Sequence, residues 1–195
     1  MNQRLIVATR NAHKVEEIRA ILTDYEVCDL SVIVDPPEVE ETGTTFLANA
    51  TLKALAISKL TDALVLSDDS GLEVDALGGA PGVYSSRYGG EDGNDALNNA
   101  KLLRELGDEQ NRRARFRCVI VLAQGGKALA DFSGAVEGGI LTAAQEGEGG
   151  FGYDPLFVPD GYAESFARLG EKVKNTLSHR SKALDGVKQW LSERA

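Results

Sequence analysis

The sequence predicts an α/β fold with a mixed β-sheet flanked by helices. Short β-rich runs alternate with segments whose apolar residues recur at helical spacing, which is typical of parallel strands joined by helices. Two later β-rich runs are separated only by a Gly-containing turn, which predicts an antiparallel hairpin. At 195 residues with 43% hydrophobic side chains, the chain can bury a sizeable core. We therefore expect residues 1–195 to form a single domain with two lobes and no separate modules.

The first half of the chain is predicted to run strand, helix, helix, strand. Residues 4–8 form a short β-rich run, and the apolar residues that follow fall at i, i+3 and i+7 from Val15. The same helical spacing returns over residues 46–57. A buried strand then covers Leu64 to Ser67 and is expected to end at two adjacent acids, Asp68 and Asp69.

The second half is predicted to begin with a long loop. Residues 77–90, "LGGAPGVYSSRYGG", are rich in Gly, Pro and Ser and show neither helical nor alternating periodicity. A helix follows around residues 96–103, and two strands then flank a turn that contains Gly125 and Gly126. The Gly-rich stretch "EGEGGFGYDP" interrupts the pattern, and apolar spacing from Leu184 to Leu191 predicts a closing helix.

Composition narrows the possible partners and location of the protein. Thirty acidic and 21 basic side chains give a formal net charge of −9, which opposes non-specific attraction to nucleic acids and anionic membranes. No apolar run approaches the roughly 20 residues of a membrane span, and the first residues lead into a strand pattern rather than a signal peptide. We therefore expect a cytoplasmic protein. Cys28 and Cys118 lack any partner spacing, which favours buried thiols over a disulfide or a zinc site.

The adjacent acids Asp68 and Asp69 are the first candidates for chemistry. Neighbouring side chains of a strand point to opposite faces, but a turn into Ser70 would let both carboxylates reach one cation. Glu41, just before the second predicted helix, is a third candidate ligand. Mg²⁺ prefers one or two carboxylates together with waters and phosphate oxygens, so these acids suit a metal-bound nucleotide. For the pair taken alone, a solvated turn is the simpler alternative.

Residues 8–14, "ATRNAHK", lie between the first strand and the first helix. Free backbone N–H groups and the positive end of the helix dipole favour an anion there, and Thr9, Asn11 and Lys14 add polar or charged donors. The segment is not a Walker loop, because the pattern G-x-x-x-x-G-K-[ST] is absent from the sequence. An ordinary helix cap with a solvent-facing Lys14 is the alternative interpretation.

The second predicted helix carries Asn49 and Lys53 four residues apart, so they share a face. That face would point either toward the three acids or, as a solvated polar stripe, into water.

Two later segments, "FGYDP" at residues 151–155 and "KNTLSHRSKAL" at 174–184, have the residues to bind a planar base. An aromatic ring beside Gly permits stacking, while Lys174, His179 and Arg180 offer donors to a phosphate or a ring oxygen. The alternative is structural, because cores usually bury aromatic residues such as Phe151 and Tyr153.

Five segments, taken in order, resemble the inosine triphosphate pyrophosphatase family, most closely its bacterial branch. They extend from Thr9 to Leu184 and read "TRNAHK", "ETGTTFLANATLKA", "LSDDSGLEVDALGGAPGVYSSRYGG", "FGYDPLFVPDG" and "EKVKNTLSHRSKAL". Enzymes of this family hydrolyse ITP, dITP and XTP. Thr9 and Arg10 stand where many relatives carry Ser or Thr followed by Gly, so the hydroxyl is retained.

The resemblance implies a two-lobed fold with a long mixed sheet, a nucleotide in the cleft between lobes, a Mg²⁺ requirement and a homodimer. It implies that Asp69 orients or deprotonates the attacking water with help from Asp68, and that Glu41 and Asp69 bind the metal. The substrate-binding residues that it implies are Thr9, Arg10, Asn11, Ala12, His13, Lys14, Lys53, Ser70, Phe151, Gly152, Tyr153, Asp154, Lys174, His179 and Arg180.

The predicted reaction is attack of water on the α-phosphorus, which releases pyrophosphate and leaves a nucleoside monophosphate. Hypoxanthine and xanthine present an oxygen at C6 where adenine presents an amino group, so Arg180 and backbone N–H groups near His179 would favour 6-oxo purines. Guanine shares that oxygen, so the exclusion of GTP rests on the behaviour of the family alone. The predicted role is to keep deaminated purines out of DNA and RNA.

Three alternatives remain open from the sequence. The same acids and lysines would serve a phosphatase, or a pyrophosphatase for another set of nucleotides. A nucleotide-binding protein without turnover is disfavoured by the retention of all three acids. An RNA-binding module is disfavoured by the net charge of −9 and by the lack of basic patches interleaved with aromatic residues.

Overall fold

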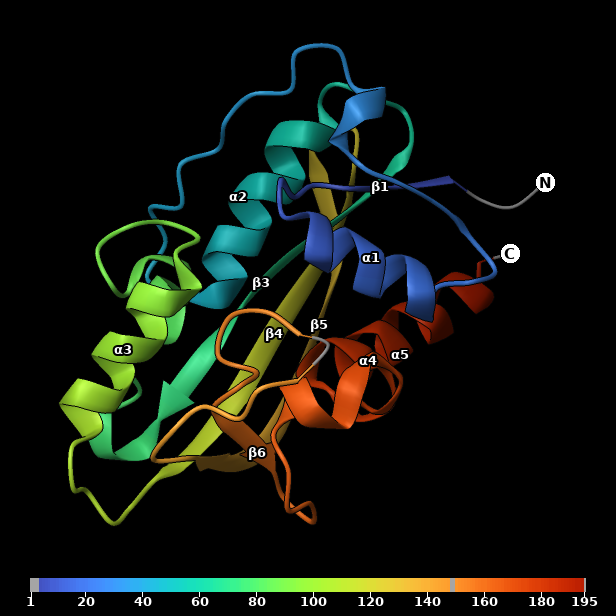
Figure 1. Cartoon of the computed structure of the whole chain (residues 1–195). Helices are drawn as coiled ribbons and strands as arrows, with labels where there is room; N and C mark the ends of the chain where they lie inside the picture. Colours follow the sequence, from blue (N-terminus) through green and yellow to red (C-terminus); the bar gives the residue numbers. More distant parts are fainter. Residues whose placement is uncertain (1–3, 148–149, 195) are drawn as a thin grey trace. The chain divides into compact units, whose positions relative to one another are not determined.

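The computed structural model describes residues 4–147 and 150–194 (Figure 1). Glu148 and Gly149, which belong to the Gly-rich stretch of the sequence analysis, lie outside the described residues. In chain order the strands and α-helices are β1 (Arg4–Val7), α1 (Ala12–Ile21), β2 (Glu26–Cys28), α2 (Phe46–Ser58), β3 (Leu64–Val74), α3 (Asp95–Leu106), β4 (Arg113–Gln124), β5 (Lys127–Ile140), β6 (Phe157–Pro159), α4 (Phe166–Leu177) and α5 (His179–Ser192). Short 3₁₀ helices are η1 (Leu30–Val32), η2 (Asp75–Leu77) and η3 (Gly82–Arg87). None of the described helices combines the length and apolar character that a bilayer-spanning segment needs.

The strands form a six-stranded mixed sheet in the order β2-β1-β3-β4-β5-β6. β1 pairs in parallel with both neighbours, so that Leu5 lies opposite Val27 of β2 and Leu64 of β3. β5 and β6 are antiparallel, with Gly139 opposite Val158. The prediction of an α/β fold with a mixed sheet is therefore confirmed.

The predicted hairpin is formed by β4 and β5. Gly125 and Gly126 connect the two strands with φ angles of 56° and 76°. Two-residue hairpin turns require such positive φ values, which Gly adopts without a steric penalty. Three elements have no counterpart in the sequence prediction, namely the three-residue strands β2 and β6 and the helix α4. Helix α4 contains one residue with non-helical backbone angles, Gly170, at φ 79° and ψ 168°.

β3 continues past the acid pair, so the prediction that this strand ends at Asp68 and Asp69 was wrong. The strand covers 11 residues. Beyond the acids, Leu72 and Val74 are fully buried in a hydrophobic cluster that also contains residues of α3. Burial of these two side chains stabilises the extended backbone over the expected turn. The two carboxylates consequently keep the alternation of a strand.

The chain divides into two compact units. The first contains Met1–Asp69, Cys118–Gly134 and Arg180–Ala195, and the second contains Ser70–Arg117 and Ala135–His179. Three of the boundaries fall inside the long strands β3, β4 and β5, and the fourth falls at the start of α5.

In the first unit, helices cover both faces of the strands. Leu64 and Leu66 of β3 lie in the hydrophobic cluster that α1 and α5 bury, whereas Val65 lies in a cluster with residues of α2. The apolar faces predicted for these three helices are the buried ones. Because strand residues alternate between faces, Asp68 continues the row that faces α1 and α5, and Asp69 continues the row that faces α2.

In the second unit, the core is built from aromatic and aliphatic side chains. The ring of Phe157 lies 4.7 Å from that of Phe116 and 5.4 Å from that of Phe166, measured between centroids. Leu102 and Leu106 anchor α3 in the same cluster. Polar side chains nearer the N-terminus of α3 contact two loops of the unit.

The segment 77–90 was expected to lack regular structure, and this expectation was partly wrong. It contains the six-residue 3₁₀ helix η3. Side-chain hydrogen bonds hold it in place: Ser85 Oγ accepts from Leu72 N at 2.9 Å, and Asn98 Nδ2 donates to Ser86 O at 2.9 Å. Since polar contacts rather than a periodic apolar face stabilise η3, hydrophobic spacing did not reveal it.

Candidate active site

Asp68 is completely buried and lies against two cations. Its Oδ2 is 3.2 Å from Lys14 Nζ of α1 and 2.9 Å from Arg180 Nη2 of α5. Burial acts to raise the pKa of Asp68, but Lys14 and Arg180 outweigh burial, and the pKa lies far below its ordinary value. Asp68 is therefore ionised throughout the neutral range. Its Oδ1 has no hydrogen-bond partner among the described residues.

Arg180 joins Asp68 to another acid, Glu17, which the sequence prediction did not include. The Arg180 side chain is 1% exposed, and its Nη1 donates to Glu17 Oε2. Glu17 follows Lys14 by three residues, which places both on one face of α1, and this spacing is the only sequence signal for it. The guanidinium that was expected to contact the base is thus engaged by two carboxylates of the first unit.

Asp69 faces α2 and belongs to a second group of charges. Its Oδ2 accepts from Asn49 Nδ2 at 3.1 Å, and its Oδ1 lies 3.8 Å from Lys53 Nζ. Lys53 Nζ also donates to Glu41 Oε1 at 2.6 Å. Burial raises the pKa of Asp69, although Lys53 and Lys14 act in the opposite direction. We call Glu41, Lys53 and Asp69 the acid–lysine cluster.

Asn49 and Lys53 do not form a solvated stripe, because Asn49 is fully buried and the Lys53 side chain is 13% exposed. Asn49 Oδ1 accepts from Gly43 N at 2.8 Å, so its amide links the segment before α2 to Asp69. A Cβ at Gly43 would lie 2.6 Å from that Oδ1, which is closer than packed atoms approach. Gly43 therefore allows the segment that carries Glu41 to lie directly against α2.

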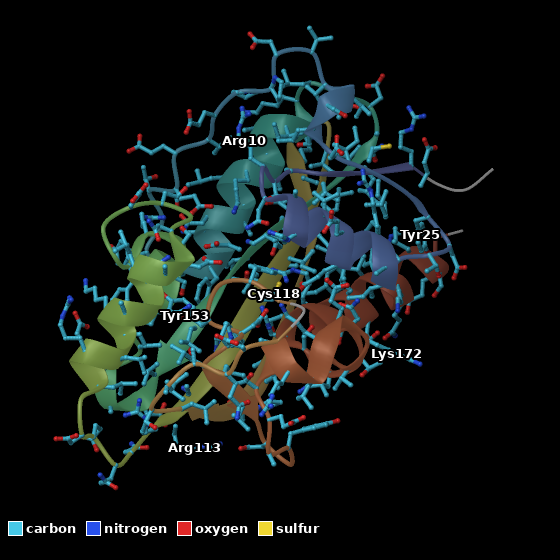
Figure 2. The ribbon with its side chains drawn as sticks, in the orientation of Figure 1. Arg10, Tyr25, Arg113, Cys118, Tyr153 and Lys172 are labelled. Atoms are coloured by element: carbon cyan, nitrogen blue, oxygen red, sulfur yellow. The ribbon has the colours of Figure 1, made fainter. Side chains whose placement is uncertain are left out.

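The predicted phosphate-binding segment lies at the surface, at the N-terminus of α1. Asn11 is the N-cap residue and its side chain accepts from Lys14 N at 3.2 Å, while Thr9 Oγ1 accepts from Asn11 N at 3.2 Å. The side chain of Arg10, labelled in Figure 2, donates to Pro36 O at 2.8 Å. Ala12 and His13 are exposed in the first turn of the helix, and His13 Nδ1 lies 4.0 Å from Glu16 Oε2. The helix cap is therefore present, whereas Lys14 turns inward to Asp68 rather than to solvent.

In the second unit, the segment after Gly150 forms a compact polar loop. Asp154, which is buried, accepts from Phe151 N at 2.8 Å and from Lys174 Nζ at 2.5 Å. Lys174 Nζ also lies 4.3 Å from the centroid of the Phe151 ring. A cation above the ring holds one face of Phe151 by electrostatic attraction to its π-system. The structure thus brings together three residues that the sequence assigned to base binding.

Three further predicted residues have structural contacts. Tyr153 is 3% exposed within the core of the second unit, and its hydroxyl donates to Ser85 O at 2.8 Å. His179 is buried at the start of α5 and stacks on Phe116, with 4.9 Å between ring centroids. Ser70 is half-buried in β3, directly after Asp69. Tyr153 therefore contributes its aromatic ring to the core, as the structural alternative for this residue proposed.

Comparison with known proteins identifies the family. A model described as the Ham1 family matches residues 5–190. The chain belongs to the Ham1 family. Two similar proteins, both named dITP/XTP pyrophosphatase, come from Desulforamulus reducens, 49% identical over 97% of this chain and 96% of the relative, and from Oceanobacillus iheyensis, 44% identical over 97% and 98%. The resemblance drawn from the five sequence segments is thereby confirmed.

Solved structures of Ham1 proteins have the same fold. The Ham1 protein of Staphylococcus aureus matches with a TM-score of 0.88 at 39% identity, covering 99% of this chain and 100% of that chain. A HAM1 protein from Coxiella burnetii matches with a TM-score of 0.87 at 37% identity, covering 98% and 99%. The arrangement of strands and helices around the acids is therefore that of the Ham1 fold.

The Ham1 relationship implies a divalent metal, and the acid–lysine cluster fits one. Glu41 and Asp69 both approach the single ammonium of Lys53, at 2.6 and 3.8 Å, so their carboxylates already share one cation. No group of three or more His, Cys, Asp or Glu side chains suited to a metal occurs within the described parts of the chain. Mg²⁺ needs only one or two carboxylates when phosphate oxygens and waters complete its shell. The donor set therefore suits a metal that arrives with a phosphate-bearing ligand.

Proposed function

We propose that this protein hydrolyses the non-canonical purine nucleoside triphosphates ITP, dITP and XTP to the nucleoside monophosphate and pyrophosphate. The observation that carries the proposal is the acid–lysine cluster, in which a buried carboxylate with a raised pKa lies beside a lysine and a second acid. Relatives that match nearly the whole chain are named dITP/XTP pyrophosphatase, which supports this proposal. Removal of deaminated purines from the nucleotide pool is the corresponding biological role.

Asp69 is the proposed base, and the residues around it prepare it for that role. Its raised pKa makes it a stronger base than an ordinary aspartate. Asn49 donates to Oδ2 at 3.1 Å and so fixes the plane of the carboxylate, which directs Oδ1 toward the side of Lys53. An oriented carboxylate of this kind holds a water molecule for in-line attack and accepts its proton.

The phosphate end of the substrate requires positive charge, which this chain supplies locally despite its net charge of −9. Lys53, together with the N-terminus of α1 and Lys14, would hold the triphosphate. Glu41 and Asp69 would hold Mg²⁺. When bound, Mg²⁺ supplies Lewis-acid neutralisation of charge on the phosphate oxygens.

Asp68 acts through charge rather than through direct contact in this proposal. Its carboxylate positions Lys14 at 3.2 Å and Arg180 at 2.9 Å, and it stays ionised at neutral pH because these cations hold its pKa low. It therefore assists Asp69 by fixing the cations of the neighbouring face.

We propose that the base is held by the segment Phe151–Asp154 with Lys174 and His179, whereas Arg180 binds Asp68 and Glu17 and is not part of this proposal. Lys174 Nζ lies 4.3 Å from the centroid of the Phe151 ring, and we propose that a purine stacks on this ring. Donors directed at a 6-oxygen would reject the 6-amino group of adenine, because a buried donor without a partner is costly.

A substrate panel tests the proposal. Purified protein is assayed against ITP, dITP, XTP, GTP, ATP and UTP with and without Mg²⁺, and the products are separated by ion-exchange chromatography. ITP should yield IMP and pyrophosphate. Formation of IDP and orthophosphate would instead identify the alternative phosphatase chemistry, and preference for another base would identify another nucleotide set.

A matched pair of variants tests the assigned base. Asp69→Asn should lower kcat by roughly 100-fold or more, because general-base catalysis contributes factors of that size. Asp62→Asn changes an exposed aspartate shortly before β3 and should leave kcat unchanged. Unaltered hydrolysis by Asp69→Asn would show that another group acts as the base, and binding of ITP without turnover by the wild-type protein would support the regulatory alternative.

We also propose a homodimer in the cytoplasm, which the family resemblance and the intracellular location of nucleotide pools support. Sedimentation velocity at micromolar concentration distinguishes a dimer from a monomer.

A further inference from the structure

Two side chains of α3 hold both polar atoms of a single peptide residue, Gly152. The Gly152 N–H donates to Asp95 Oδ2 at 2.6 Å. The Gly152 carbonyl accepts from Asn99 Nδ2 at 2.9 Å. Neither Asp95 nor Asn99 belongs to the residues that sequence or family resemblance connects with the reaction.

The geometry of α3 holds Asp95 and Asn99 rigidly, and we call this pair the clamp. Asp95 is the first residue of the helix and Asn99 lies four residues later, so both project from one face. The helix is fixed at one end by Leu102 and Leu106, which are buried in the core of the second unit, and at the other by the N-cap residue Asn94. The two polar groups are thus presented by a well-anchored element.

Gly152 needs such a clamp because it has no side chain whose packing could restrain its backbone. Its φ is +63°, and no atom lies within 4 Å of the position that a Cβ would occupy. Glycine has more backbone freedom than any other residue, so the two hydrogen bonds from α3 restrict the orientation of this peptide. The neighbouring residues are held separately, Phe151 by Asp154 and Lys174, and Tyr153 by Ser85.

We propose that Asp95 and Asn99 are positioning residues for nucleobase recognition, acting through the backbone of Gly152. The clamp sets the direction in which the chain leaves Phe151 and therefore the tilt of the ring on which a base would stack. This inference rests on the proposed function only in assigning the segment Phe151–Asp154 to the base. It predicts that loss of the clamp weakens binding of the correct base more than it slows the chemical step.

A property of Asn99 distinguishes positioning from general stabilisation. Its Oδ1 has no hydrogen-bond partner among the described residues, so the bond to Gly152 is the one that the structure gives to its side-chain amide. Truncation to alanine removes this bond and an unsatisfied oxygen together. The free energy of unfolding should therefore change little, while the loop should still lose its restraint at Gly152.

Steady-state kinetics of four variants test the proposal. Asp95→Ala should raise the KM for ITP about tenfold and Asn99→Ala about fivefold, with kcat within about twofold of wild type, as expected for loss of one charged and one neutral hydrogen bond in binding. Asp95→Asn retains an acceptor oxygen and should return the KM to within about threefold. Arg104→Ala changes an exposed side chain of the same helix, five residues after Asn99, and should leave the KM unchanged.

A second measurement reports directly on how strongly the clamp restrains the loop that contains Gly152. Hydrogen–deuterium exchange of a peptide covering residues 150–156 should be faster in Asp95→Ala than in wild type and should be unchanged in Arg104→Ala. If the wild-type protein did not hydrolyse ITP, the proposed function would fail while exchange still tested the clamp. If wild type were active and both alanine variants at Asp95 and Asn99 kept the wild-type KM, or if Arg104→Ala raised the KM as much as Asp95→Ala, the positioning role would be refuted.

Discussion

Neutralising Asp68 should destabilise the folded protein substantially, because this carboxylate balances two cations away from water. In Asp68→Asn, Arg180 at 2.9 Å and Lys14 at 3.2 Å lose their shared negative partner. Removing one member of a buried ion pair costs about 3–5 kcal/mol. Arg180 retains Glu17, and Lys14 is 13% exposed and can turn toward water, so we expect the lower end, about 3 kcal/mol.

This free energy has a measurable signature in thermal unfolding. For a chain of 150–250 residues, each kcal/mol lowers the Tm by about 2–4 °C, so Asp68→Asn should unfold about 6–12 °C below wild type at pH 7. Differential scanning calorimetry measures the shift, and Asp62→Asn serves as the exposed control.

The pH dependence gives an independent check of the same reasoning. The pKa of Asp68 is lowered in the folded protein from its ordinary value of 3.8, so its stabilising effect is complete above that value and is lost as pH falls through the folded pKa. The difference between wild type and Asp68→Asn should therefore be constant near neutrality and shrink below about pH 4. A variant that unfolds within 2 °C of wild type at pH 7, like the control, would refute the claim that Asp68 compensates buried charge.

Other features of the structure lead to further predictions. Gly43→Ala should lower the rate of ITP hydrolysis at least about tenfold, because its Cβ would come within 2.6 Å of Asn49 Oδ1. Gly139→Ala is the control and should behave as wild type, because the nearest atom to its Cβ would be 3.5 Å away. Ellman's reagent at about pH 8 should modify Cys28 and spare Cys118 until the protein unfolds, because burial raises the pKa of Cys118 to about 12. Equal rates for both thiols would argue against the burial of Cys118 in the core. Removal of divalent ions with EDTA should abolish hydrolysis yet leave the circular dichroism spectrum unchanged, since Lys53 already balances the acid–lysine cluster; loss of secondary structure would mean that the metal is structural.

Several elements could be predicted from the sequence because they depend on short-range spacing. The helices α2 and α5 bury the apolar positions that recur every three to four residues, and Gly125 and Gly126 supply the positive φ values of the hairpin. Local signals failed where long-range packing decided the backbone. Nothing adjacent to Asp68 and Asp69 indicates that β3 continues, since the reason is the burial of Leu72 and Val74 against α3.

The candidate site shows the same division. The types and order of its residues, from Lys14 to Arg180, were sufficient to indicate phosphate chemistry with a divalent metal, because carboxylates, lysines and a helix N-terminus are the groups that such chemistry requires. Their grouping was not available from the sequence. The strand alternation of β3 separates Asp68 from Asp69, and only the positions of α1, α5 and α2 determine which cations each acid meets.

By itself the sequence determined the family and most of the helical and hairpin elements and predicted the chemical class of the site, because these follow from residue identity and from contacts within a few residues. The tertiary structure alone decided that Asp68 compensates buried cations while Asp69 lies beside Asn49 and Lys53, and that Asp95 and Asn99 reach Gly152 more than 50 residues away. Electrostatic energy and hydrogen bonding depend on distances between atoms, and in a folded chain those distances bear no simple relation to separation along the sequence.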